Sequence, residues 1–397
     1  MILYRILQNL NLREQPTTAS PSRGVFAAGL VVQFIQFNDD KTWINVTIKR
    51  INGTVIEGWM SAKFLKLVDK EPLTWKLGIN MREFAYYGSG ADGIQFAPEG
   101  LRDQQLATAR DLGIRYVRFF ASRRSHDTAG TIRQLTKAID SCRKFNLQAF
   151  VCLDDSLTGA QMFMQGNDQF HRGPMGHLTM DYFTSRHYRT TFIPHIKKIV
   201  TAFANHPNIL LWELGNEMGI YQPEGQPQGI PQTAGSNAYV DFVSESSRAI
   251  KDISSTHLVS TGLITTHHVY TQKVPPPTRE AFARRLYQVP TIDAVGVHYY
   301  RHDKHELLQY INVDIAIARE LGKPFYVGEV GGDISGGDRT GFLGDEIAFW
   351  KRSGAFTVMP WQLDTSDNDV NIGDTLGIAK RRHPDYDSIL ARLKTLA

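Results

Sequence analysis

Two glutamates, Glu217 and Glu329, each lie just past a run of apolar residues. The runs cover residues 209–214 and 325–327, so the two side chains are far apart in the sequence. Two carboxyl groups that flank one bond form the apparatus of glycosidic cleavage, in which one protonates the leaving oxygen and the other attacks the anomeric carbon. We therefore interpret this pair as the candidate reactive groups.

Residues 73–397 alternate between strand-like and helix-like patterns, and these elements would have to position the two carboxyl groups. Apolar runs predict eight strands, at 77–81, 116–120, 149–153, 209–214, 258–263, 294–297, 325–327 and 356–359. Apolar residues at helical spacing follow each run, as at Ile132, Leu135, Ile139 and Cys142. This α/β pattern predicts a (β/α)8 TIM barrel. A doubly wound open sheet is the alternative, but its glycine-rich fingerprint does not follow the first run.

The active site of such a barrel is built at the carboxyl ends of its strands. Polar residues just past the apolar runs are therefore candidates for it: Arg82, Glu83, Arg118, Asp154, Asp155, Asn216, Glu217, His298, Tyr300, Glu329 and Trp361. Glu217 ends the fourth predicted strand and Glu329 ends the seventh. We expect these two to face one another across the barrel mouth.

The first 70 residues have a shorter hydrophobic periodicity than the rest of the chain. Short alternating segments predict strands at 4–7, 31–35, 43–48 and 55–59, separated by clusters of turn-forming residues. Several short strands in so few residues predict a small, closed, all-β barrel. A polar link, Val68–Pro72, separates it from the larger domain at 73–397.

The first 70 residues contain a pattern made of Leu10–Arg13, Trp43 and the Gly58–Ser61 sequence Gly-Trp-Met-Ser. In this pattern the N-terminal region resembles the bacterial Src-homology-3 family. It implies attachment to a cell wall, a peptide or a sugar as the partner of residues 1–70. A domain that only spaces or rigidifies the enzyme is the alternative, because a fold does not determine a function.

The larger domain contains two distinctive segments, Trp212–Glu217 and Val327–Glu329, together with His298–Tyr300 and Trp361. In these residues it resembles the retaining glycoside hydrolases of clan A, most closely the cellulase and β-mannanase group called family five. The resemblance implies a retaining endo-β-1,4-glycosidase that hydrolyses a polysaccharide such as β-mannan or β-glucan. An exo-acting β-glycosidase on the same barrel and a non-catalytic glycan- or cell-wall-binding protein are the alternatives.

The resemblance also implies a role for each site residue. Glu217 would be the acid/base and Glu329 the nucleophile. The others would contact the sugar or the nucleophile: Asn216 at the 2-hydroxyl, Arg118 and Tyr300 at the nucleophile, His298 in the pocket lining, and Trp361 as the floor for the sugar ring.

Each of these supporting residues also has a purely structural interpretation. Arg118 could be the counter-charge of Glu213, because a buried unpaired carboxylate is costly. His298 could be a hydrogen-bonded core histidine, and Trp361 could serve packing alone, although its place after the eighth run favours exposure at the mouth.

The sequence departs from the family pattern after the third and fourth predicted strands. Asp154 and Asp155 stand where many cellulases of the family carry a histidine, and Met218 follows the acid in place of a common proline. We expect irregular loops at 170–182 and 221–236 to wall the cleft.

The net charge of +4 comes from the N-terminal region. Residues 1–70 hold nine Lys and Arg against five Asp and Glu, so the remainder of the chain is neutral. This balance argues against nucleic acid as a partner and leaves a weak anionic contact for the N-terminal region.

We expect no cofactor and no metal. The thirteen histidines come without a cysteine cluster or a His-Glu-x-x-His motif, and Asp367–Asn371 lacks the glycine and terminal glutamate of a calcium loop. No apolar run approaches the roughly 18 residues of a membrane helix, so we expect no membrane span. Met1 begins a strand-like segment without the features of an export signal. We expect a secreted, extracellular protein if a signal has been removed, and an intracellular one otherwise.

Overall fold

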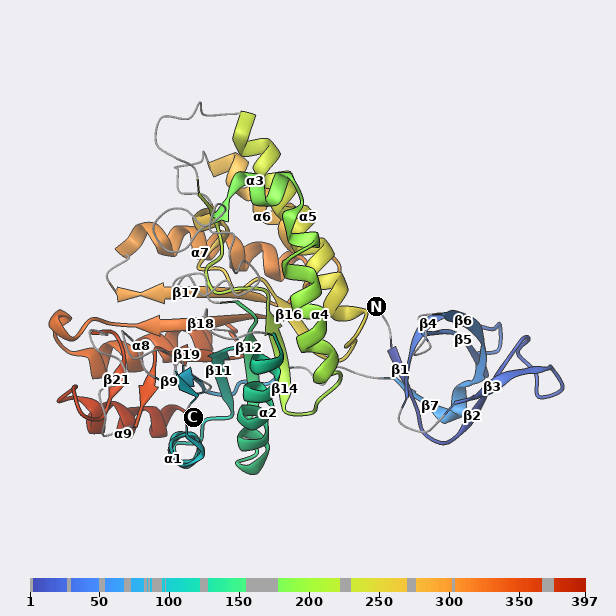
Figure 1. The fold of residues 1–397 in the computed structure, drawn as a ribbon, viewed down its shortest axis with the longest axis horizontal. Coiled ribbons are helices and arrows are strands. Elements are labelled where there is room, and N and C mark those ends of the chain that lie inside the picture. Colours follow the sequence, from blue (N-terminus) through green and yellow to red (C-terminus); the bar gives the residue numbers. More distant parts are fainter. Residues whose placement is uncertain are drawn as a thin grey trace. The chain divides into compact units, whose positions relative to one another are not determined.

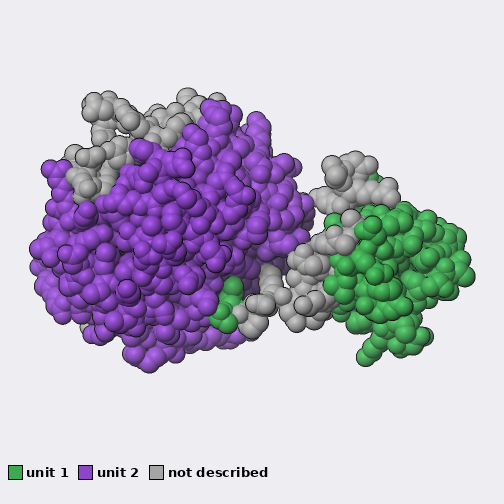
Figure 2. Space-filling view, turned by 90° about the horizontal axis from the view of Figure 1, so that it is seen from below, with its two compact units in different colours: residues 1–74 green, residues 75–397 purple. Residues whose placement is uncertain are grey.

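The computed structural model describes residues 3–26, 30–49, 54–67, 73–81, 84, 86–87, 95–96, 98–121, 128–154, 178–221, 230–269, 276–301, 304–365 and 375–397. The chain divides into two compact units, Met1–Thr74 and Trp75–Ala397, which Figure 2 distinguishes by colour. Each unit has its own hydrophobic core.

The first unit is an antiparallel sheet that curls around its core (Figure 1). Its strands are β1 (Leu3–Ile6), β2 (Leu10–Arg13), β3 (Ser22–Phe26), β4 (Val31–Phe37), β5 (Trp43–Lys49), β6 (Val55–Ser61) and β7 (Leu65–Leu67). They pair in the order β3-β2-β6-β5-β4-β1-β7. Alternation places Leu10 and Leu12 in the core, and Asn11 and Arg13 toward the outside. The predicted small all-β barrel is confirmed.

The second unit contains the eight predicted strands, which pair with one another in parallel. They are β8 (Gly78–Asn80), β11 (Tyr116–Phe120), β12 (Gln148–Cys152), β14 (Ile209–Glu213), β16 (Leu258–Ser260), β17 (Val295–Tyr300), β18 (Phe325–Gly331) and β19 (Val358–Pro360). Two ladders, β16-β14-β12-β11-β8 and β17-β18-β19, make up the wall. Backbone hydrogen bonds link the two ladders at both edges. Lys76 N–H donates to Phe356 O at 3.1 Å beside β8 and β19, and Asp293 N–H donates to Val259 O at 2.8 Å beside β17 and β16.

Helices lie outside these strands in Figure 1. They are α1 (Glu99–Asp111), α2 (Thr128–Lys144), α3 (Met180–Thr184), α4 (Phe192–Ala202), α5 (Ile230–Lys251), α6 (Pro276–Tyr287), α7 (Lys304–Glu320), α8 (Arg339–Arg352) and α9 (Tyr386–Leu396). Their apolar stripes face the sheet, as predicted from the spacing. The (β/α)8 architecture is therefore confirmed.

The loop predictions are wrong in part. Residues 230–236, placed in a loop from their Gly, Pro and Gln content, begin the long helix α5. Likewise, the end of the loop predicted at 170–182 forms β13 (Leu178–Thr179) and the start of α3. The other short strands are β9 (Tyr86–Tyr87), β10 (Gln95–Phe96), β15 (Ile220–Tyr221), β20 (Leu363–Asp364) and β21 (Ile378–Ala379). Within the described ranges, no helix is both long enough and apolar enough to cross a bilayer.

Candidate active site

Arg118, on β11, is the centre of a buried polar network at the carboxyl ends of the strands. Its side chain is 0% exposed. The guanidinium donates through Nε to Glu213 Oε2 at 2.7 Å and through Nη1 to Glu329 Oε1 at 2.7 Å. Nη2 donates to Asn216 Oδ1 at 2.8 Å. The two interpretations of Arg118 are therefore both realised, since one planar guanidinium contacts the structural carboxylate and the candidate nucleophile together.

Two residues absent from the sequence-based candidates complete this network. Asn80, in β8, accepts a bond from Arg118 Nη1 at 3.0 Å and donates to Gly328 O at 2.8 Å. Tyr326, in β18, donates its hydroxyl to Glu213 Oε1 at 2.6 Å. A polar side chain inside an otherwise apolar run was the available signal for both, because such a group needs a buried partner.

Glu329 is held from two sides. Besides the Arg118 contact, its Oε2 accepts a bond from the Tyr300 hydroxyl at 2.5 Å. Gly331, paired with Tyr300 across the sheet, leaves room for this ring, since a Cβ there would lie 2.6 Å from Tyr300 Cε1. Burial raises the pKa of Glu329, while the positive charge of Arg118 and the Tyr300 bond act in the opposite direction.

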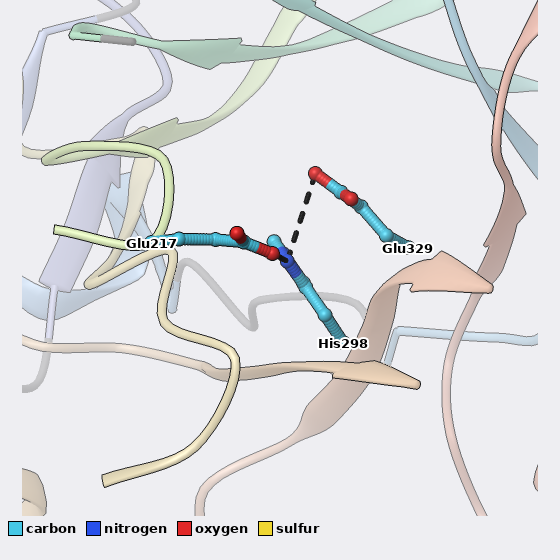
Figure 3. Close-up of side chains that lie close together, drawn as sticks. All are labelled: Glu217, His298 and Glu329. Carbon is cyan, nitrogen blue, oxygen red and sulfur yellow. Dashed lines mark hydrogen bonds and ion pairs between the residues drawn. The ribbon is translucent and has the colours of Figure 1, made fainter. Parts of the chain in front are cut away.

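Glu217 approaches from the turn after β14 (Figure 3). Its backbone is left-handed, with φ of 53°, which is uncommon for a residue other than glycine. The conformation is held by its N–H, which donates to Gly262 O at 2.8 Å. Gly262 itself has φ of 72°, and a Cβ there would lie 2.1 Å from Gly215 O. Only glycine therefore fits this contact between the turns after β14 and β16.

His298, on β17, lies between the two glutamates in Figure 3. Its Nδ1 is 2.6 Å from Glu217 Oε1 and 3.6 Å from Glu329 Oε1. Burial lowers the pKa of His298 to about 4, so the ring is neutral near pH 7. A neutral imidazole can share one proton with Glu217 without adding charge, and the structural interpretation as a hydrogen-bonded core histidine also describes this contact.

The carboxyl groups of Glu217 and Glu329 come close together. One oxygen of each, with a ring nitrogen of His298, forms a set whose members all lie within 4.8 Å of one another. Such a set could hold a metal ion, but its closest two atoms are 2.6 Å apart, whereas two ligands on a tetrahedral zinc are roughly 3.3 Å apart. The geometry therefore fits a hydrogen-bonded pair better than a ligand set. The expectation of no metal stays a prediction.

Asn216 and Trp361 also lie at this end of the barrel. Asn216 is buried, and its N–H donates to Asp154 O at 2.7 Å. Trp361 is 7% exposed and packs in a small cluster with Phe120 and Cys152, next to Tyr300. The expected exposure of Trp361 at the mouth is thus not observed, because Phe120 lies against its ring, with centroids 6.4 Å apart.

The remaining candidates divide into two groups. Asp154 is buried directly beyond β12, at the same end of the barrel. Arg82, Glu83 and Asp155 lie outside the described residues, as does Asp367–Asn371.

The first unit matches a known family by sequence. Residues 8–66 match the bacterial SH3 domain family, which confirms the resemblance seen at Leu10–Arg13 and Gly58–Ser61. No curated protein matches the sequence at a significant level.

Several solved structures share the fold. An endo-β-1,4-mannanase from Thermotoga petrophila superposes with a TM-score of 0.60 at 18% identity, over 82% of this chain and 77% of that one. An endo-1,4-β-mannanase from Rhizomucor miehei gives 0.62 at 14% identity, over 84% and 97%. The endoglucanase Cel5A of Pseudomonas stutzeri gives 0.52 at 13% identity, over 80% and 93%. These similarities define a (β/α)8 barrel of the type found in family-five mannanases and cellulases.

Proposed function

We propose that the protein is a glycoside hydrolase whose second unit cleaves β-1,4-linked polysaccharides from within the chain, with retention of configuration. The observation that carries this proposal is the approach of Glu217 and Glu329 at the barrel mouth, with carboxyl oxygens within 4.8 Å. Retaining enzymes place their two carboxyl groups about 5–5.5 Å apart, whereas inverting enzymes leave about 6.5–9.5 Å for a water molecule.

In the first step, Glu217 donates its proton to the glycosidic oxygen and Glu329 attacks the anomeric carbon. The glycosidic C–O bond breaks as a bond forms between the anomeric carbon and a Glu329 oxygen. Arg118 and Tyr300 each bind one oxygen of Glu329, at 2.7 and 2.5 Å, which orients the carboxylate and favours its charged form.

In the second step, Glu217 removes a proton from water, which attacks the anomeric carbon and releases Glu329. Formation of the ester has removed the charge of Glu329, so Glu217 ionises more easily and can serve as the base. The neutral His298 ring can donate its Nδ1–H to Glu217 Oε1, 2.6 Å away, both when Glu217 is the acid with its proton on Oε2 and when Glu217 is the carboxylate. The same hydrogen bond can therefore persist through both steps.

One further residue would bind the sugar. Asn216 adjoins Glu217, and its amide can contact the 2-hydroxyl, where hydrogen bonds strengthen in the transition state. Trp361 is only 7% exposed and packs against Phe120, so a sugar would meet no more than the small exposed part of its ring. We propose β-mannan or β-glucan as the substrate, because the similar structures include mannanases and an endoglucanase.

The test compares Glu217→Gln and Glu329→Gln with the unaltered protein on soluble β-mannan and β-glucan. Glu320→Gln is the matched control, since Glu320 lies exposed on α7. Either site variant should reduce the release of reducing ends by at least about 10³-fold, and the control should not. A rapid loss of viscosity would indicate internal cleavage. Normal activity of Glu329→Gln would refute the proposal.

Azide distinguishes the two roles on an aryl β-glycoside. In Glu329→Ala, azide can attack the substrate itself from the vacated side and should give the α-glycosyl azide. In Glu217→Ala, azide attacks the glycosyl-enzyme and should give the β-glycosyl azide. The reverse pattern would exchange the two assignments.

A further inference from the structure

The first unit contains a surface groove of about 690 Å³ that the proposed reaction does not use. It is lined by Arg13 at the end of β2, Lys41 in the turn before β5, Trp43 at the start of β5, and Lys63 and Phe64 in the 3-10 turn Ala62–Phe64. All of its lining residues lie in the described part of the chain, and none of them is acidic.

The three cations of this groove are available to a ligand. None of them forms an ion pair with a residue of the described ranges. Arg13 is oriented by a bond from Nη1 to Ser20 O at 2.6 Å, and the Lys63 ammonium lies 4.6 Å from the centroid of Phe64. Hydrogen bonds from Thr42 and Asn38 lower the pKa of the neighbouring Asp40, so this carboxylate stays ionised beside Lys41. The lining itself still carries three cations and no acid.

The rest of the lining is suited to hydroxyl groups and to the flat faces of sugar rings. It contains side-chain amides and hydroxyls, at Gln8, Asn9, Asn11, Thr18, Thr42 and Ser61, beside the aromatic rings of Trp43 and Phe64. Amides and hydroxyls can pair with sugar hydroxyls, and aromatic faces pack against the C–H face of a pyranose.

The position of the groove in the sheet argues against recognition by strand addition. Arg13 and Trp43 belong to β2 and β5, which both have neighbours on either side, whereas the sheet edges are β3 and β7. The backbone of β2 and β5 is already paired, so an extended peptide cannot add to it as a new strand. Recognition here has to occur through side chains.

We propose that this groove binds an acidic polysaccharide, with carboxylate-bearing sugars contacting Arg13, Lys41 and Lys63 and a sugar ring packing on Trp43. The site does not involve Glu217 or Glu329, so it can fail or succeed independently of the proposed reaction.

The experiment measures binding of the full-length protein to polygalacturonate by calorimetry at low salt, with its fully methyl-esterified form as the uncharged counterpart. Lys41→Gln and Lys63→Gln are tested singly and together, and Arg23→Gln is the control, since Arg23 is an exposed cation on β3 outside the groove. Arg13 is left intact because of its bond to Ser20.

Each lysine variant should weaken binding roughly 2–5-fold and the double variant roughly 5–20-fold, as expected for exposed charges. Arg23→Gln should bind normally, the esterified polymer should bind far more weakly, and all variants should unfold at the same temperature as the unaltered protein. Equal binding by the double variant and the control would overturn the proposal. So would equal, lysine-dependent binding of polyglutamate, which would indicate an acidic peptide site instead.

Discussion

The candidate site of the second unit and the groove of the first use charged side chains in opposite ways. In the second unit, Arg118 and Glu213 are both 0% exposed and 2.7 Å apart, inside a network that also holds Glu329. In the first unit, Lys41 and Lys63 are exposed along a groove. Charges buried at low dielectric interact strongly and escape screening, whereas exposed charges are screened by salt. The contrast is between a buried network around the two glutamates proposed to react and an exposed groove proposed to bind a polymer.

The largest expected effect comes from breaking the buried network. Arg118→Gln leaves Glu213 and Glu329 without their shared cation and should lower the free energy of unfolding by about 3–5 kcal/mol. Urea denaturation measures this change. Arg352→Gln, at an exposed position on α8, should change it by less than about 0.5 kcal/mol. Equal stability of the two variants would mean that the network is not buried as described.

A buried carboxylate elsewhere in the second unit should produce a pH dependence. Asp314, on α7, accepts bonds from Thr266 N–H at 2.8 Å and from the Thr266 hydroxyl at 2.5 Å. Burial raises the pKa of Asp314 from 3.8 to about 6. The folded state therefore keeps this proton where the unfolded chain has lost it, so the stabilisation is present at low pH and is lost as the pH rises through 6.

Comparison with Asp314→Asn isolates this contribution, because the other titrating groups cancel. From pH 4.5 to 7.5, the unfolding free energy of the unaltered protein should fall by about 2 kcal/mol relative to the variant. Chemical denaturation at several pH values measures the difference. A difference that does not change with pH would contradict the prediction.

Two tyrosines separate stability from catalysis within the same network. Tyr326→Phe removes the donor to Glu213 and should cost about 1–2 kcal/mol of stability. Tyr300→Phe removes the donor to Glu329 and should reduce kcat by roughly 10–100-fold, with a smaller loss of stability because Tyr300 is only half-buried. Denaturation curves and kinetics on both variants test this, and identical behaviour would show that the two bonds serve one purpose.

The smallest expected effect concerns salt. Raising the salt concentration from 50 to 300 mM should change hydrolysis of a neutral polysaccharide by less than about twofold, because the network around Arg118 is buried. The same change should weaken binding of an acidic polymer to the groove several-fold. Hydrolysis and polymer binding are measured at both salt concentrations on one preparation. Equal salt dependence of the two would contradict the contrast between a buried site and an exposed groove.

Local patterns were sufficient for most of the architecture. The eight strands of the barrel and their helices followed from periodicity, since each buries an apolar face that its own sequence displays. The errors fell where this signal is weak. Residues 230–236 are rich in loop-forming types yet begin α5. The strands β2, β3 and β7, of three to five residues each, lie outside the four segments predicted in the first unit.

The candidate site was less accessible from sequence. Glu217 and Glu329 could be selected because strand ends meet at one face of a barrel. Asn80 and Tyr326 were harder to select, because a single polar residue within a buried strand signals that it needs a buried partner but not which residue is that partner. Trp361 was misjudged because its exposure depends on Phe120, which belongs to a different strand.

By itself, the sequence determined which segments form strands and helices and which side chains stand at the strand ends, because these depend on patterns spanning a few neighbouring residues. Only the tertiary structure decided that one guanidinium joins Glu213, Glu329 and Asn216, and that Gly262 holds Glu217 in a left-handed conformation. Those contacts link residues up to 211 positions apart, and a hydrogen bond depends on distances and angles that no local pattern encodes.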